Sequence, residues 1–433
     1  MSSYYLEWLN LLGRWAHMIT GIAWVGASFY FVWLDNHLLD PAHEQDREKG
    51  VAGEVWSVHG GGFYHSQKYQ LAPQTLPSTL HWFKWEAYTT LISGVFLLAL
   101  IYWYGAEIYL IDPAVMALPK SLAILIGMLV LPLGWIVYDQ LCKSALRKND
   151  LHLGIVMFLV LVVVAFALCQ VFSGRGAFMH FGAMLGTIMV ANVFFVIIPG
   201  QKDLVAAKVA GRSPDPQHGI NGKQRSVHNT YFTLPVLLVM ISNHYAMTYS
   251  HEWNWLILIG LSLFGALIRV YFVQRHKGKG SPLLLIAAAL ILAAIIAALA
   301  PSQTDSQSAA THSHDGSATA GGAVGIAAGA GIGAKGVTTA TDNSSVEAVP
   351  VTFASVSGIV MERCAGCHAL KPTYPGFYAP PQGLLLDNDE NIRAQMLKIY
   401  QQSVATKAMP IGNVTGMLDQ ERELIGRWYR DNP

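Results

Sequence analysis

Residues 151–172 read LHLGIVMFLVLVVVAFALCQVF, and no Asp, Glu, Lys or Arg interrupts the run. An α-helix rises about 1.5 Å per residue, so a run of this length reaches across the roughly 30 Å apolar core of a bilayer. Residues 282–300 have the same character. Both stretches predict membrane-spanning helices.

The composition of the whole chain agrees with a membrane protein. Hydrophobic residues make up 53% of the chain and charged residues 13%, whereas soluble proteins carry about 25% charged residues. The net charge of +1 argues against nucleic-acid binding. We therefore expect an all-α fold, a polytopic bundle of eight transmembrane helices, at residues 11–34, 86–104, 118–140, 151–173, 177–199, 229–249, 254–273 and 282–300.

The distribution of basic residues predicts the orientation of this bundle, because cytoplasmic loops are rich in lysine and arginine. With residue 1 outside, the cytoplasmic loops are 35–85, 141–150, 200–228 and 274–281, and these loops hold most of the basic residues. The periplasmic loops hold Arg175, with Lys120 at a helix mouth. The first residues lack the basic start of a signal peptide, so the first span is expected to be retained. The pattern predicts a multi-pass protein of the bacterial inner membrane, surrounded by lipid, with both termini periplasmic.

The motif Cys364-Ala365-Gly366-Cys367-His368 is the attachment signal of a c-type haem. Two thiols at this spacing can bond the two vinyl groups of one porphyrin, and His368 can then bind the iron. A zinc site or a redox dithiol are the alternatives, but a structural zinc needs a second Cys/His pair. The remaining cysteines, Cys142 and Cys169, lie far upstream in apolar surroundings. Covalent haem attachment takes place outside the bacterial cytoplasm, which agrees independently with the predicted periplasmic C-terminus.

A methionine is the expected second ligand of this iron. Met409 stands directly before a proline and is favoured, with Met417 as its competitor. His/Met ligation raises the reduction potential and suits electron transfer. Helices predicted at 353–363, 388–402 and 419–430 complete a small class I-like cytochrome c domain.

The composition divides the chain into three parts. Residues 302–350 are rich in Gly, Ala, Ser and Thr, which predicts a flexible linker. The linker separates a transmembrane domain, 1–301, from a periplasmic cytochrome c domain, 351–433.

Three histidines fall inside predicted spans, where ionisable groups are costly and often functional. His17, His180 and His244 all come to the periplasmic half of the bundle. Similar spacing of small residues after His17 and His180 indicates a four-plus-four internal repeat, which would make these two histidines equivalent. They could bind the iron of a non-covalent haem b, with His244 as a substitute ligand or a propionate partner. The alternative is that the histidines bond neighbouring helices as packing contacts.

The predicted cytoplasmic side carries aromatic loops with hydrogen-bond donors. Such loops suit the binding of a flat heterocycle, and a His or Glu at the membrane edge could serve as a general base. The alternative is an interfacial aromatic belt. The candidate residues are His59, Phe63, His81, Trp85, Glu86, His228, Asn229 and Thr230.

The chain resembles the membrane-integral urate oxidases, also called urate hydroxylases of the PuuD type. The segments that carry the resemblance are 13–17 (GRWAH), 21–26 (GIAWVG), 59–64 (HGGGFY), 80–86 (LHWFKWE), 228–235 (HNTYFTLP), 243–244 (NH) and the C-terminal C-x-x-C-H domain. The resemblance implies that urate is oxidised to 5-hydroxyisourate, with electrons passed to cytochrome c rather than to dioxygen.

The resemblance also suggests roles for the candidate residues. His81, Glu86 or His228 would remove a proton from urate, while Trp85 and Phe63 stack on the purine. Asn229 and Thr230 would bond its carbonyls, with His59 nearby. Electrons would leave through the His17/His180 site to the C-terminal haem, then to a soluble or membrane acceptor such as a cytochrome c or a terminal oxidase. Two rival functions remain, a non-catalytic electron-transfer subunit of a partner dehydrogenase and a transporter with a fused redox sensor.

Overall fold

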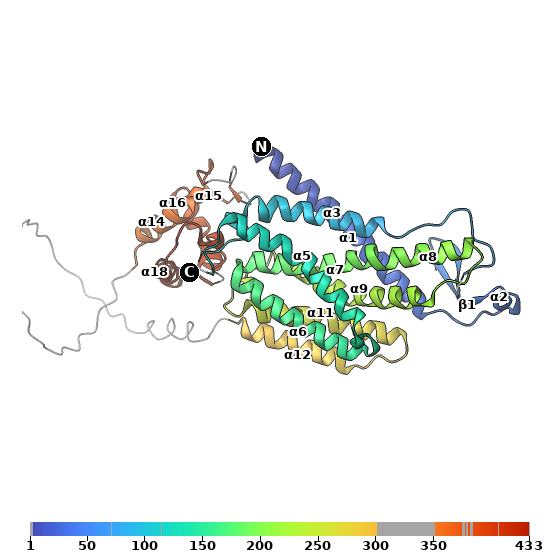
Figure 1. Ribbon diagram of the computed structural model, residues 1–433. Helices are drawn as coiled ribbons and strands as arrows, with labels where there is room; N and C mark the ends of the chain where they lie inside the picture. Colours follow the sequence, from blue (N-terminus) through green and yellow to red (C-terminus); the bar gives the residue numbers. More distant parts are fainter. Residues whose placement is uncertain are drawn as a thin grey trace, which may run out of the picture.

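The computed structural model describes residues 3–70, 72–113, 115–300, 351–374, 377, 380–381, 384–405 and 407–432. The described chain is mostly helical, with one bundle of long helices and a smaller C-terminal domain (Figure 1). The predicted linker, 302–350, lies outside the described residues. The N-terminal end of the first helix and the C-terminal domain lie at one end of the bundle in Figure 1. We call this the C-domain end.

Each predicted span overlaps a bundle helix, although the span predicted at 229–249 runs past the end of its helix at Ser242. The bundle helices are α1 (Ser3–Asn36), α3 (Trp85–Leu97) continued by the π-helix η1 (Leu98–Trp103), α5 (Lys120–Lys143), α6 (Asp150–Val171), α7 (Gly174–Asn192) continued by η3 (Val193–Ile197) and α8 (Ile198–Val209), α9 (Pro216–Ser242), α11 (Asn254–His276) and α12 (Leu283–Ala298). Short helices α4 (Ala106–Tyr109), η2 (Ala145–Lys148) and α10 (Ala246–Tyr249) lie in the connections.

Six helices of the described chain are long and apolar enough to cross a membrane, rather than the eight expected. The two exceptions are α9 and α12. The α9 helix begins at Pro216, where the Asp215 side chain accepts a hydrogen bond from Gln217 N at 2.8 Å, and its first half is polar. The apolar α12 helix has only 16 residues.

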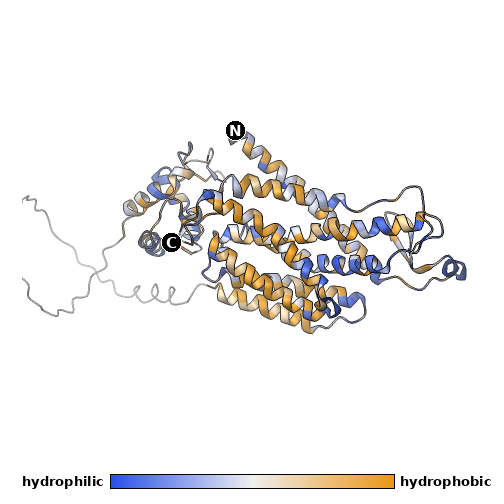
Figure 2. Ribbon diagram, viewed as in Figure 1, coloured by the Kyte–Doolittle hydropathy of each residue, from blue (hydrophilic) through white to orange (hydrophobic). Residues whose placement is uncertain are grey.

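The α7 helix forms the centre of the bundle. Its side chains Phe178, Phe181, Leu185 and Ile188 are almost fully buried, and the helix packs against α5, α6 and α9. The bundle helices are coloured as hydrophobic along most of their length, with hydrophilic residues mainly towards their ends (Figure 2), and many of their large apolar side chains are exposed. Such broad exposed apolar surfaces suit contact with lipid.

Glycines let these helices approach closely. A Cβ at Gly127 of α5 would lie 2.6 Å from His180 Nε2, and one at Gly134 would lie 2.3 Å from Met184 Cγ. A Cβ at Gly182 of α7 would lie 2.7 Å from Val239 of α9. Small residues at helix crossings are typical of membrane bundles, where close packing replaces hydrophobic driving force.

The predicted all-α fold is wrong for residues 51–69, which form an antiparallel hairpin. Strand β1 (Val51–His59) pairs with β2 (Gly62–Tyr69). The turn residues Gly60 and Gly61 have φ of +57° and +80°, which glycine adopts without steric cost and two-residue hairpin turns require. The hairpin and α2 (Glu44–Glu48) lie at the end of the bundle opposite the C-terminal domain (Figure 1), which we call the hairpin end.

The C-terminal domain has a core of its own. Its elements are α14 (Phe353–Arg363), α15 (Ala365–His368), α16 (Asp389–Ala394), α17 (Met396–Ile399), η5 (Tyr400–Ala405), η6 (Ile411–Asn413) and α18 (Asp419–Asp431). The helices predicted at 353–363 and 419–430 are confirmed. The helix predicted at 388–402 is interrupted at Gln395, which leaves the helical region with φ −112° and ψ 11°. Val356, Ile392, Ile425 and Trp428 form the centre of this core.

The C-terminal domain touches the bundle through η6. Gly412 has φ of +58°, and a Cβ there would lie 3.2 Å from the carbonyl oxygen of Ile111 and 3.5 Å from that of Ile108. These two carbonyls belong to α4 and the residues just after it. The turn that follows Met409 therefore lies against the segment that follows η1.

Candidate functional site

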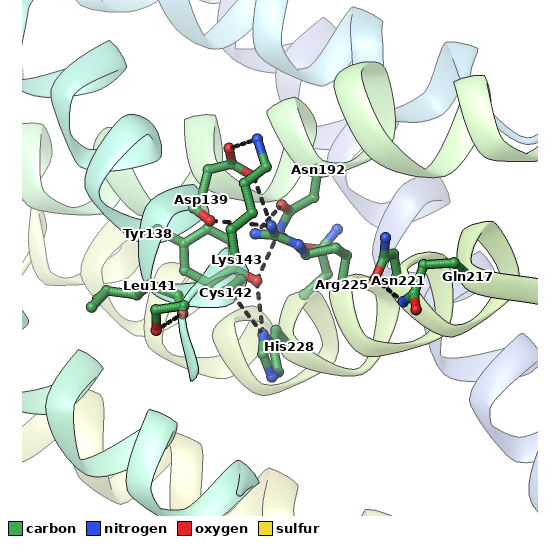
Figure 3. Close-up of polar contacts among 12 residues, drawn as sticks. Tyr138, Asp139, Leu141, Cys142, Lys143, Asn192, Gln217, Asn221, Arg225 and His228 are labelled. Atoms are coloured by element: carbon green, nitrogen blue, oxygen red, sulfur yellow. Dashed lines mark hydrogen bonds and ion pairs between the residues drawn. The ribbon is translucent and has the colours of Figure 1, made fainter. Parts of the chain in front are cut away.

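A buried polar network joins α5, α7 and α9 (Figure 3). Asn192 of α7 donates from Nδ2 to Tyr138 Oη at 3.2 Å and to Asn229 Oδ1 at 2.9 Å. Asn229 in turn donates from Nδ2 to the Met189 carbonyl at 2.9 Å. We call this cluster the α5–α7–α9 network; its members are Tyr138, Asp139, Asn192, Arg225, His228 and Asn229.

An ion pair closes one side of the network. Arg225 Nη2 donates to Asp139 Oδ1 at 2.7 Å, and its guanidinium lies 4.9 Å from the centre of the Tyr138 ring. Lys143 Nζ lies 2.6 Å from the other oxygen of Asp139. Asp139 and Arg225 are both 3% exposed, and buried charges are tolerated only when they are paired. The pair therefore ties α9 firmly to α5.

Tyr138 is a hydrogen-bond partner of His228. Tyr138 Oη lies 2.8 Å from His228 Nδ1 and already accepts a hydrogen bond from Asn192. If the phenol donates its own proton to Nδ1, a neutral His228 carries its proton on Nε2. In this form Nε2 is a hydrogen-bond donor, which suits a contact with a substrate carbonyl better than proton abstraction. Cys142 Sγ lies 3.8 Å from the same Nδ1.

The neighbours of His228 on α9 already have partners within the chain. Asn229 uses both ends of its amide inside the network. Thr230 Oγ1 donates to the Ser226 carbonyl at 3.1 Å and lies 3.3 Å from Ser28 Oγ of α1. Asn229 therefore braces α7, and Thr230 links α9 to α1.

The other candidate residues of the hairpin end fall into two separate places. His81, Trp85 and Glu86 lie at the start of α3, where the His81 ring meets Phe83 edge-on at 4.5 Å and Trp85 is 63% exposed. His59 ends β1, and Phe63, near the start of β2, is 79% exposed. The network thus gathers His228 and Asn229 only.

A groove of about 570 Å³ opens between β2, the segment 72–80 and α8. Lys68, Tyr69 and Lys208 are among the residues that line it, and none of the residues predicted for the site does so.

Sequence reasoning missed four members of the network, Tyr138, Asp139, Asn192 and Arg225. Asp139 was detectable, because it is an acidic residue inside the predicted span 118–140, and a charge in a span indicates a functional or structural role. Asn192 lies inside span 177–199 in the same way. In the sequence, Arg225 belongs to the predicted cytoplasmic loop 200–228, where it contributed only to the count of basic residues.

The histidines of the C-domain half contact different helices. His17 Nδ1 lies 3.1 Å from the Thr90 carbonyl and 3.0 Å from Ser93 Oγ, both on α3. His180 is fully buried, with Nδ1 2.8 Å from the Gly176 carbonyl. Its Nε2 accepts a hydrogen bond from Trp103 Nε1 at 3.2 Å. His244 is exposed.

These contacts do not fit a haem shared between His17 and His180. A ligating histidine needs a free Nε2, and that of His180 is held by Trp103 and lies against Gly127 of α5. His17 packs instead on Gly94 of α3, where a Cβ would lie 2.9 Å from its ring. The haem b stays a prediction of the sequence, and we derive no step through it.

The haem-attachment motif has a geometry that fits a haem c. Cys364, Cys367 and His368 lie on one short turn, and His368 Nδ1 is 3.1 Å from the Leu384 carbonyl. This bond orients the ring and leaves Nε2 for a metal. Burial lowers the pKa of His368, against the opposing effect of the Leu384 bond, and so favours the neutral imidazole that metals require. Across the described residues, no three His, Cys, Asp or Glu side chains gather at a metal site.

The two candidate methionines differ in their surroundings. The Met409 backbone is held on both sides, by Gln402 O at 2.8 Å and by Arg422 Nη1 at 2.7 Å, while its side chain is half-buried. Met417 is 3% exposed and packs in the core of the C-terminal domain. Met409 is thus the less buried of the two, and its role as the iron ligand stays a prediction.

Comparison with known families identifies the larger part of the chain. Residues 3–300 match the family model described as urate oxidase N-terminal. No curated protein and no solved structure shows significant similarity to the chain. The matched range contains the whole helical bundle, the hairpin and the α5–α7–α9 network. Because the match covers well over half of its length, the chain belongs to the urate oxidase N-terminal family.

Proposed function

We propose that this chain oxidises urate to 5-hydroxyisourate within the inner membrane of a bacterium and delivers the electrons to a haem c of its own. The observation that carries the proposal is the fusion of a urate oxidase family bundle, residues 3–300, with a C-x-x-C-H motif. The family supplies the substrate class. The motif supplies an electron acceptor on the same polypeptide.

Cys364 and Cys367 would hold the haem, with His368 and Met409 as the iron ligands. Haem c, when bound, takes up one electron at a time at a raised potential. Urate and one water give 5-hydroxyisourate, two protons and two electrons. Each turnover therefore requires two successive transfers, and a soluble or membrane acceptor, such as a cytochrome c or a terminal oxidase, collects them.

The hairpin end would bind the substrate. His228, held by Tyr138 with its proton on Nε2, would donate a hydrogen bond to a purine carbonyl. Proton acceptance would then fall to His81 or Glu86 at the start of α3. Trp85 and Phe63 offer exposed aromatic faces that suit stacking on a flat heterocycle. His59, beside Phe63 on the hairpin, and Thr230 would add polar contacts.

The orientation of the bundle supports the same proposal. The start of α1 and the C-terminal domain lie at one end, and the hairpin lies at the other (Figure 1). With the basic loops on the cytoplasmic side, both termini would be periplasmic. Urate would then be oxidised on the cytoplasmic side and its electrons collected outside.

The decisive experiment adds urate to membranes that contain the protein and follows the haem absorption bands without oxygen. We expect reduced haem to appear together with urate loss, at two haem equivalents per urate. A haem that stays ferric while urate is unchanged would contradict the proposal and favour an electron-transfer subunit that serves a partner dehydrogenase.

Two variants test the residues. His228→Ala and His81→Ala should each abolish urate loss, whereas the content of covalent haem should stay that of the wild type. Haem attaches about 280 residues downstream of His81, so its content reports whether the chain matured. Turnover retained in both variants would contradict the assignment of the site.

A further inference from the structure

Two arginines are buried in the hairpin half of the bundle, and only one of them has an anionic partner. Arg225 is neutralised by Asp139 at 2.7 Å. Arg269 of α11 is 7% exposed, yet no Asp or Glu of the described residues forms an ion pair with it. Its Nε has no hydrogen-bond partner in the described part of the chain.

An unpaired guanidinium in this position is costly. Removing a charge from water costs several kcal/mol unless another charge or a set of hydrogen bonds compensates it. Arg269 lies seven residues before His276, the last residue of α11, and is therefore about 10 Å inside the helix end. Its guanidinium carbon lies 3.7 Å from the centre of the Phe29 ring of α1. This cation–π contact recovers only about 2 kcal/mol.

The surroundings of Arg269 suit a flat anion. Ser28 of α1, which precedes Phe29 in the chain, has its hydroxyl 3.3 Å from that of Thr230 on α9. A guanidinium can bond two adjacent acceptors of a planar anion at once. Thr230 and Tyr231 also follow His228 and Asn229 directly on α9.

We propose that Arg269 binds the negative charge of the substrate, an oxopurine anion, in a site formed by α1, α9 and α11. This inference rests on the proposed function, because urate is an anion at neutral pH. The chain neutralises Arg225 internally and leaves Arg269 for the ligand. Arg269 is thus a binding and specificity residue, separate from the candidates for proton transfer.

The test compares Arg269→Gln with Arg275→Gln in membranes that contain the full chain. Arg275 is an exposed arginine near the end of the same helix and serves as the matched control. The measurements are equilibrium binding of radiolabelled urate and, separately, KM and kcat for urate loss. A charge-assisted hydrogen bond is worth about 1.5–3 kcal/mol, so Arg269→Gln should weaken binding and raise KM about 10- to 100-fold. Arg275→Gln should leave both unchanged.

A purely structural arginine would give a different result, with less folded protein and lower kcat but an unchanged KM. An unchanged urate affinity in folded Arg269→Gln would overturn the inference. If Arg269→Gln does not accumulate as folded protein, Arg269→Lys provides the test of the inference. It keeps the charge but loses the planar fork, and we expect KM about tenfold higher; an unchanged KM would again overturn the inference.

The two measurements separate this inference from the proposed function. Urate binding that depends on Arg269 but leads to no urate loss would contradict the proposed oxidation and support Arg269. Urate loss with equal KM in wild type and Arg269→Gln would contradict Arg269 alone. A wild-type chain that neither binds nor consumes urate would contradict both.

Discussion

At the scale of single residues, a buried ion pair joins two helices of the bundle. Asp139 and Arg225 are 86 residues apart in the chain and 2.7 Å apart in space. Both are buried, so each depends on the other. The same pair positions Asn192, whose Oδ1 lies 3.4 Å from Arg225 Nη1, and through it the Tyr138 phenol that orients His228.

Asp139→Asn should therefore destabilise the bundle strongly. It leaves Arg225 buried without a counter-charge, which costs about 3–5 kcal/mol when one partner of a buried pair is lost. Lys143→Gln removes the other cation of Asp139, but Lys143 is 63% exposed and its pairing is worth no more than about 1 kcal/mol.

Thermal unfolding in detergent measures both effects. The double change Asp139→Asn with Arg225→Gln removes both charges together and should recover much of the loss. Equal stability of Asp139→Asn and wild type would show that the pair does not hold α5 to α9.

At the scale of elements, glycines allow the helices of the bundle to approach each other closely. Gly127 and Gly134 are one heptad apart on α5 and face His180 and Met184 of α7. The π-helix η1 brings Trp103 to the same ring nitrogen of His180. Single π-turns are frequent at functional sites because they redirect side chains within a helix. His180 is thus enclosed by α5, by η1 and by its own helix α7.

Gly127→Ala tests this packing. Its new Cβ would lie 2.6 Å from His180 Nε2 and 3.3 Å from Trp103 Nε1, so the helices must separate or the ring must turn. We expect a loss of about 1–3 kcal/mol in stability, the usual cost of overpacking. Gly154→Ala on α6, where nothing lies within 4 Å of the new Cβ, is the control and should be neutral or slightly stabilising. Matching melting temperatures of the two variants would refute the close contact.

At the scale of the whole molecule, the C-terminal domain meets the bundle at the turn that follows Met409. The turn after Met409 lies against Ile108 and Ile111, which follow η1 and Trp103 directly. Docking at this point would keep the Met409 side of the domain within short reach of the bundle. Electron transfer within the chain would then depend on that contact.

Gly412→Ala should slow the reduction of the haem by urate while leaving urate affinity unchanged. Its Cβ would press on two backbone carbonyls of the bundle. Gly416→Ala is the matched control, since Gly416 also has positive φ, +66°, and lies in the same loop, but nothing lies within 4 Å of its Cβ. Both variants carry the same backbone strain of about 1–2 kcal/mol.

Stopped-flow absorption of the haem after mixing with urate gives the rate. Slower reduction in Gly412→Ala than in Gly416→Ala is the expected result. Equal rates would show that the contact at η6 plays no part in the transfer.

The sequence by itself determined the features that depend on neighbouring residues. Long apolar runs predicted the positions of all eight bundle helices, although only six meet the length and hydropathy expected of a span. The C-x-x-C-H spacing placed two thiols and an imidazole on one turn, where α15 has them. The hairpin was not predicted, although the Gly60-Gly61 pair that makes its turn is a sequence signal for such a hairpin.

Only the tertiary structure decided which residues meet across helices. His180 contacts Trp103 and Gly127 rather than His17, and Asp139 forms an ion pair with Arg225. In a soluble protein the apolar face of a helix reveals its inward side. In a bilayer both the lipid and the neighbouring helices are apolar, so the sequence marks where a helix runs but not which face it buries.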